Sequence, residues 1–132
     1  MRESTIKTIS ISSVNTPEAT GGYSEAIMVK NAHRQLFISG QIPVNVQGIV
    51  PETFEEQARL AWENIKHLLE AAGMGLENIV KHTTYLSSRK YTSANSEVRQ
   101  EILGNLKPAL TVIIADIYDK EWLLEIEAIA VD

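Results

Sequence analysis

The strongest hydrophobic pattern in the chain predicts a helix near its middle. From residue 54 to residue 72, apolar positions recur at steps of three and four, the spacing of one face of an amphipathic helix. These positions are Phe54, Ala58, Ala61, Ile65, Leu68 and Ala72. Thr53 and Glu56 fit a capping box at the start, and Gly73 is typical of a helix end. We therefore expect a helix that buries this apolar stripe.

Segments rich in β-branched residues predict six strands around this helix and a second, shorter helix. The expected strands are 5–13, 26–30, 35–42, 79–86, 109–115 and 123–131, and the second helix covers 93–103. Strands 26–30 and 35–42 are expected to form a hairpin across the polar tip 31–34. The order of elements predicts a single α+β domain over residues 1–132, with two helices and about six strands.

The predicted sheet has more apolar surface than two helices can cover. In the last strand, one face carries Leu124, Ile126, Ala128 and Ala130, which we expect to meet the helices. Segment 109–115 is apolar on both faces, as in a strand buried on both sides. Because the two helices can cover only one face of the sheet, we expect self-association to cover the other.

Composition narrows the classes of function. Hydrophobic residues make up 44% and charged residues 22%, which is typical of a soluble globular protein. The chain has no cysteine, which excludes disulfides and thiolate chemistry. A net charge of −5 argues against nucleic-acid binding, and no apolar run reaches the roughly 20 residues of a membrane span. The three histidines lie far apart without metal-ligand spacing, so no metal site is expected. We expect a cytoplasmic protein.

Two features could carry chemistry. Ser39-Gly40 stands where a strand breaks into a loop, and a glycine there lets a ligand approach the backbone and its N–H. On spacing alone, a plain turn at the end of a strand is the favoured interpretation. Glu125 lies in an otherwise apolar strand, where a carboxylate can act as an acid, a base or a holder of water. A solvated strand face is the commoner reason for such acids.

A series of ordered blocks extends over nearly the whole chain. The blocks are Ser39–Asn45, Glu56–Arg59, Glu70–Gly73, Ile79–Lys81 with Thr83 and Tyr85, Lys107–Ala109 and Glu125–Ala130. Together they resemble the RidA/YjgF family, from about Pro17 to Val131. The combination is highly specific.

This resemblance implies a fold, an assembly and an activity. The family has a chorismate-mutase-like α+β fold, with a mostly antiparallel six-stranded sheet, two helices on one face and assembly as a homotrimer. Its members bind a small molecule in a cleft between subunits. Well-known members hydrolyse enamines and imines, such as 2-aminoacrylate, to keto acids and ammonia without a metal or organic cofactor.

The resemblance also assigns the site residue by residue, with departures at Gly22, where relatives usually have a proline, and at Leu110. The assigned positions are Tyr23 and Glu125 as catalytic residues, and Ser39, Gly40, Asn95 and Leu110 in substrate binding. Leu110 stands where relatives have an arginine that grips the substrate carboxylate. A leucine offers no charge-assisted hydrogen bond, so carboxylate binding should weaken about tenfold to a hundredfold. A cation from another subunit would be one route to rescue.

Two functions from different classes follow. The first is a RidA-like hydrolase for an enamine or imine substrate that is not efficient on ordinary 2-imino acids. The second is a ligand-binding or protein-stabilising trimer without catalysis. The endoribonuclease label used for some relatives gains little support from an acidic chain without a histidine pair.

Overall fold

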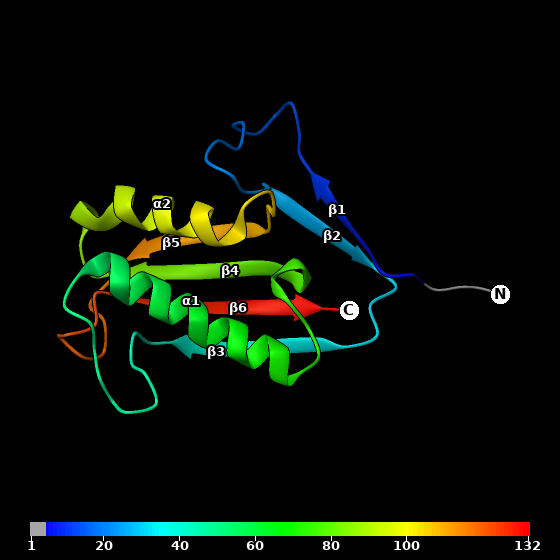
Figure 1. The fold of residues 1–132 in the computed structure, drawn as a ribbon. Coiled ribbons are helices and arrows are strands. Elements are labelled where there is room, and N and C mark those ends of the chain that lie inside the picture. The colour runs from blue at the N-terminus through cyan, green and yellow to red at the C-terminus, as the bar shows by residue number, and fades with distance from the viewer. Residues whose placement is uncertain (1–4) are drawn as a thin grey trace.

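The computed structural model describes residues 5–132, which form six strands and two α-helices (Figure 1). In chain order the elements are β1 (Lys7–Ile11), β2 (Ala26–Lys30), β3 (Gln35–Gln41), α1 (Phe54–Ala71), η1 (Leu76–Asn78), β4 (Ile79–Leu86), η2 (Arg89–Tyr91), α2 (Thr92–Leu103), β5 (Ala109–Ile114) and β6 (Leu124–Val131), where η marks a short 3-10 helix. The number and order of the predicted elements are confirmed, and so is the α+β class.

Four of the strands form a sheet with both helices on one face (Figure 1). The strand order is β3-β6-β4-β5, and β6 pairs with β3 and β4 in antiparallel fashion. Only β4 and β5 are parallel, as expected when a helix, here α2, connects two neighbouring strands. Because side chains alternate along a strand, this arrangement gives the sheet one face toward the helices and one open face.

The remaining two strands correct the predicted single six-stranded sheet. β1 and β2 pair with each other as a separate two-stranded sheet that extends beyond the four-stranded one, and Ser24, just before β2, forms a bridge with Ala109 of β5 (Figure 1). The predicted hairpin between β2 and β3 does not form. The tip between these strands is instead fixed to the chain end, because His33 and Arg34 donate backbone N–H groups to the carbonyl of Asp132. This contact aligns β3 with β6 rather than with β2.

The core lies between the helices and the sheet. On β6 the four residues predicted to face the helices are buried, with exposed fractions of 3% or less. Trp62, Ile65 and Leu69 of α1 fill the space above them. Within the predicted apolar stripe of α1, position 68 is wrong: Leu69 is buried, whereas Leu68 is 41% exposed.

Strand β5 differs from the prediction that both of its faces are buried. It is the edge strand of the four-stranded sheet, and Val112, Ile113 and Ile114 are each about two-fifths exposed. Val112 and Ile114 lie on the helix side and Ile113 on the open side, as their partners in β4 show. Within one chain, both faces of β5 therefore remain accessible.

Candidate functional site

The candidate residues Ser39, Gly40 and Glu125 come together where β3 meets β6. The register between these strands shifts between Ile38 and Gln41, so that β3 has one extra residue. Such a bulge bends the strand and re-aims its neighbours. A Cβ placed on Gly40 would lie 1.8 Å from Oε2 of Glu125, so the carboxylate lies directly against the Gly40 backbone. We call these three residues the Glu125 cluster.

The carboxylate of Glu125 is open to a ligand on one side. It lines a hollow of about 290 Å³ with Tyr85, Ala115, Asp116, Ile117 and Tyr118. Among residues 5–132, no side chain or backbone group donates a hydrogen bond to it. The hydroxyl of Tyr85, its cross-strand partner, donates instead to Glu127 over 2.7 Å, which raises the pKa of Tyr85. Both oxygens of Glu125 are therefore available to hold water or a polar ligand.

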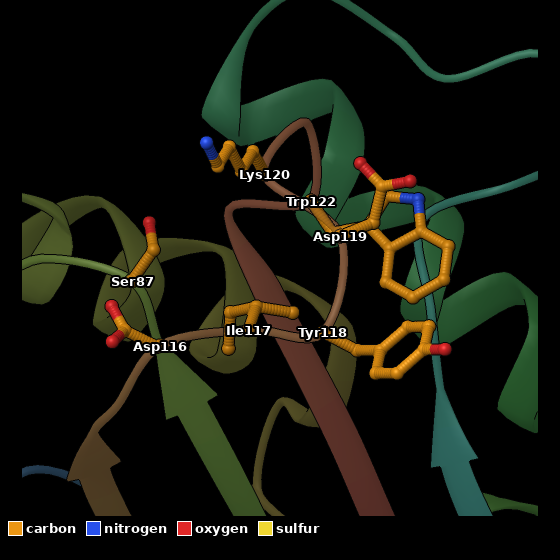
Figure 2. Close-up of a pocket in the computed structure, with 7 residues that line it drawn as sticks. All are labelled: Ser87, Asp116, Ile117, Tyr118, Asp119, Lys120 and Trp122. Carbon is orange, nitrogen blue, oxygen red and sulfur yellow. The ribbon is translucent and has the colours of Figure 1, made fainter.

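The loop between β5 and β6 forms one wall of this hollow. Together with Ser87, residues of the same loop, including Trp122, also line a second hollow (Figure 2). The rings of Tyr118 and Trp122 lie 6.3 Å apart between their centroids, and Figure 2 shows them side by side. Tyr118 is 94% exposed, so one aromatic side chain stands at the border of the two hollows without cover from the rest of the chain.

The other three candidates, Tyr23, Asn95 and Leu110, lie on a different part of the chain. Leu110 is the cross-strand partner of His82, whose side chain is buried on the helix side of the sheet. Glu125 is the cross-strand partner of Tyr85, three residues further along β4 and therefore on the opposite face. One chain does not bring Leu110 and Glu125 into a single pocket.

Two residues that sequence reasoning missed occupy the region of Leu110. Arg99 on α2 is 5% exposed, and His82 on β4 is 1% exposed. Burial, together with the charges of Arg99 and Lys81, lowers the pKa of His82 to about 3. Arg99 lies one helical turn after Asn95 and so shares its face of α2. That spacing was the available sequence signal. We call Tyr23, His82, Asn95, Arg99 and Leu110 the Arg99 cluster.

Burial also acts on Arg99 itself. Its pKa is lowered by loss of solvent, an effect partly opposed by Tyr23. The loop that carries Tyr23 is held close to Leu110, because Ser24 donates its backbone N–H to the carbonyl of Pro108 and its hydroxyl to that of Lys107. The Arg99 cluster thus combines a helix, two strands and this loop.

Neither cluster offers a metal site. No group of three or more His, Asp or Glu residues that could hold a metal ion occurs among residues 5–132. Over the same residues, no helix is both long and apolar enough to cross a membrane.

The sequence and fold of this chain match those of a known class of protein. The family model described as Endoribonuclease L-PSP matches residues 13–132. A RutC family protein of Pyrococcus horikoshii is 41% identical over 118 residues, which cover 88% of this chain and 91% of the relative. The 2-iminobutanoate/2-iminopropanoate deaminase of Capra hircus is 36% identical over 92% of this chain and 88% of its own.

Solved structures agree with this assignment. The Rid family protein YyfB of Yersinia pestis superposes with a TM-score of 0.82 at 25% identity, covering 95% of this chain and 98% of its own. TdcF of E. coli, solved with bound serine, gives a TM-score of 0.71 at 30% identity, covering 94% and 98%. The chain belongs to the Endoribonuclease L-PSP family, whose solved members include Rid proteins.

Proposed function

We propose that this protein is a RidA-like hydrolase that acts on an enamine or imine in a cleft between copies of the chain. The observation that carries the proposal is the contact between Glu125 and the Gly40 backbone, beside an open hollow. A relative that shares 36% of its residues is named an imine deaminase, which supports the same reaction class.

The chemistry requires little beyond a positioned water. Water adds to the carbon of the C=N bond, the carboxylate of Glu125 takes a proton from that water, and the nitrogen is protonated. The resulting carbinolamine then releases ammonia and leaves a carbonyl product, so that one water is consumed for each C=N bond broken. Tyr23 is proposed to donate a proton or hydrogen bond to the substrate, and the backbone at Ser39 and Gly40 to hold it.

A homotrimer would bring the two clusters together. In one chain the Glu125 cluster and Leu110 lie on opposite faces of the sheet, so a site containing both needs a second copy. The open sheet face also carries apolar residues that need cover, with Phe37 69% exposed and Ile113 43% exposed. Sedimentation equilibrium at micromolar concentration should give three times the mass of the chain, and a monomer would count against the shared cleft.

Leu110 limits which substrates are expected. Position 110 lies on β5 and carries a leucine instead of a guanidinium. The α-carboxylate of an ordinary 2-imino acid therefore has no bidentate partner at this position. We therefore propose that such imino acids are turned over inefficiently.

The direct test is a panel of imines and enamines generated in solution, with ammonia release as the readout. We expect at least one to be hydrolysed above the buffer rate, and Glu125→Gln to remove that activity. Glu121→Gln, in the exposed loop before β6, is the matched control and should leave the rate unchanged. Buffer-level rates for every substrate would count against catalysis.

The leucine at position 110, where the family resemblance places an arginine, favours a second candidate, a trimer that binds a ligand without consuming it. In that case a compound should raise the melting temperature and be recovered unchanged after prolonged incubation. Recovery of a carbonyl product instead would favour the hydrolase.

A further inference from the structure

Arg99 is a buried cation whose hydrogen-bonding capacity is only partly used. Its side chain emerges from α2, and the residue is 5% exposed. One terminal nitrogen donates to the carbonyl of Gly22 over 3.3 Å and the other to Oγ of Ser96 over 3.2 Å. Both distances are at or beyond the long end of the range for such bonds. The Nε atom is buried and has no hydrogen-bond partner among the described residues.

No acid neutralises this guanidinium within residues 5–132. The two oxygens that accept hydrogen bonds from it belong to a carbonyl and a hydroxyl. Among the described residues, Arg99 forms no ion pair with an Asp or Glu. By contrast, the exposed arginines Arg34 and Arg59 each have a carboxylate partner, Asp132 for Arg34 and Glu101 at 2.9 Å for Arg59. A buried charge without a counter-charge is costly to a folded protein. An anion bound there would supply the missing counter-charge.

Arg99 borders the region of Leu110, where the family resemblance places an arginine. Its charge acts on His82, which lies across from Leu110 in the neighbouring strand. Both ring nitrogens of His82 are also buried without a partner among the described residues. The acceptor Gly22 belongs to the loop that Ser24 ties to Pro108, two residues before Leu110. The cation on α2 and the leucine on β5 thus border the same corner.

We propose that Arg99 is the anion-binding residue of this protein, holding a small carboxylate from the side of α2 where relatives hold it from the position of Leu110. The inference rests on the proposed function for its reaction class and deepens it. Arg99 holds a small carboxylate from α2, so an ordinary 2-imino acid binds without the placement that an arginine at position 110 would give and is still turned over inefficiently. The anion would accept hydrogen bonds from the guanidinium, including its unpartnered Nε, and would replace the two long bonds to Gly22 and Ser96. His82 stays neutral there and can donate one ring N–H to the same anion.

Binding of a product analogue tests this separately from turnover. The probes are 2-oxobutanoate and its neutral amide, 2-oxobutanamide, titrated against the full-length protein and followed by the ¹H–¹⁵N signal of the Arg99 Nε–H group. We expect the carboxylate to shift this signal in the wild-type protein and the amide to leave it in place. An Nε–H signal that does not respond to the carboxylate would overturn the proposal, whether or not the protein hydrolyses imines.

Variants provide the second measurement. Arg99→Gln should weaken 2-oxobutanoate binding about tenfold to a hundredfold without changing the affinity for the amide, and Arg99→Lys should keep part of it. The control Arg59→Gln removes an exposed arginine and should leave both affinities unchanged. A purely structural role for Arg99 would lower both affinities equally, or would lower only the melting temperature, and either result would overturn the assignment. Should Arg99→Gln fail to fold, the Nε–H titration of the wild-type protein still decides the outcome.

Discussion

Gly40 and Glu125 are so close that position 40 has no room for a side chain. A Cβ there would lie 1.8 Å from Oε2 of the carboxylate, 2.7 Å from Cδ and 2.9 Å from Cγ. The far end of Glu125 is flexible, so Gly40→Ala should turn the carboxylate away rather than unfold the protein. We expect activity on the best imine substrate to fall about 100-fold, since a displacement of about 1 Å can have that effect.

A matched control exists elsewhere in the chain. A Cβ on Gly75 would lie 2.4 Å from a carboxylate oxygen of Glu77, a similar conflict between two residues that belong to neither cluster. Gly75→Ala should therefore change the melting temperature about as little as Gly40→Ala does, but it should leave the rate of hydrolysis unchanged. Equal rates for Gly40→Ala and wild type would show that the Glu125 position is not used in catalysis.

Placing an arginine at position 110 tests the role of that position. Leu110→Arg should raise hydrolysis of 2-aminoacrylate about tenfold to a hundredfold, because a guanidinium gains about 1.5–3 kcal/mol from a charged hydrogen-bond partner. The measurement is keto acid and ammonia release from 2-aminoacrylate generated in solution. A variant that assembles like wild type yet stays inert would show that the site has diverged at more than this position.

The effect of Leu110→Arg on the melting temperature should depend on Arg99. Two guanidinium groups would then border one corner, so Leu110→Arg should lower the melting temperature through repulsion between like charges. Adding Arg99→Gln should recover part of that loss. If the two changes in melting temperature simply add, positions 99 and 110 do not interact.

His82 should make stability depend on pH in the mildly acidic range. Its pKa is about 3 in the folded protein and about 6.5 when unperturbed, because burial and the charges of Arg99 and Lys81 oppose protonation. The unfolded chain therefore binds the extra proton, and stability is lost as the pH falls below 6.5. The expected slope approaches about 1.4 kcal/mol per pH unit.

Urea unfolding at pH 7, 6 and 5 measures this effect. His82→Leu should flatten the dependence in that window, whereas His67→Gln, on the exposed side of α1, should not. The range above pH 5 is chosen because Glu101 and Asp132, whose pKa values are lowered by Arg59 and Arg34, lose stabilising charge only at lower pH. A dependence that survives in His82→Leu would contradict this assignment.

Local patterns predicted most of the elements because each is set by residues close in sequence. The N-cap is an example: the hydroxyl of Thr53 accepts the N–H of Glu56 at 3.2 Å, as the motif predicts. The return half of the capping box differs, because the carboxylate of Glu56 accepts from the Thr53 hydroxyl instead of the backbone. The stripe of α1 moves from Leu68 to Leu69 because tertiary packing around Trp62, and not the helical period alone, decides which residue is buried.

Strand pairing and the site depended on contacts between distant residues, which local patterns do not contain. The pairing of β3 with β6 joins segments far apart in the sequence, with Gln35 opposite Val131, and it replaced the hairpin that proximity in sequence suggested. Arg99 and His82 drew no attention because an arginine in a helix and a lone histidine in a strand are ordinary in isolation. Their burial beside Leu110 is a property of the packed molecule.

Gln57 is the clearest case of a long-range contact that holds the site in place. It is 2% exposed on α1, and its amide nitrogen donates to the carbonyls of Pro51 and Glu121 at 2.9 and 3.0 Å. Its amide oxygen accepts the N–H of Leu123 at 2.8 Å. One side chain therefore fixes the end of the β5–β6 loop, whose earlier part lines the hollow beside Glu125.

Gln57→Leu should leave these backbone groups without partners. A buried group left unpaired costs about 1–3 kcal/mol, so the free energy of unfolding in urea should fall by at least that amount. Amide exchange at Leu123 should become faster, and activity should fall with it because the loop no longer holds its wall of the hollow. Gln100→Leu, which removes a single hydrogen bond to Ser96 on the exposed side of α2, should change stability by much less. Equal losses in the two variants would mean that the loop is held by other contacts.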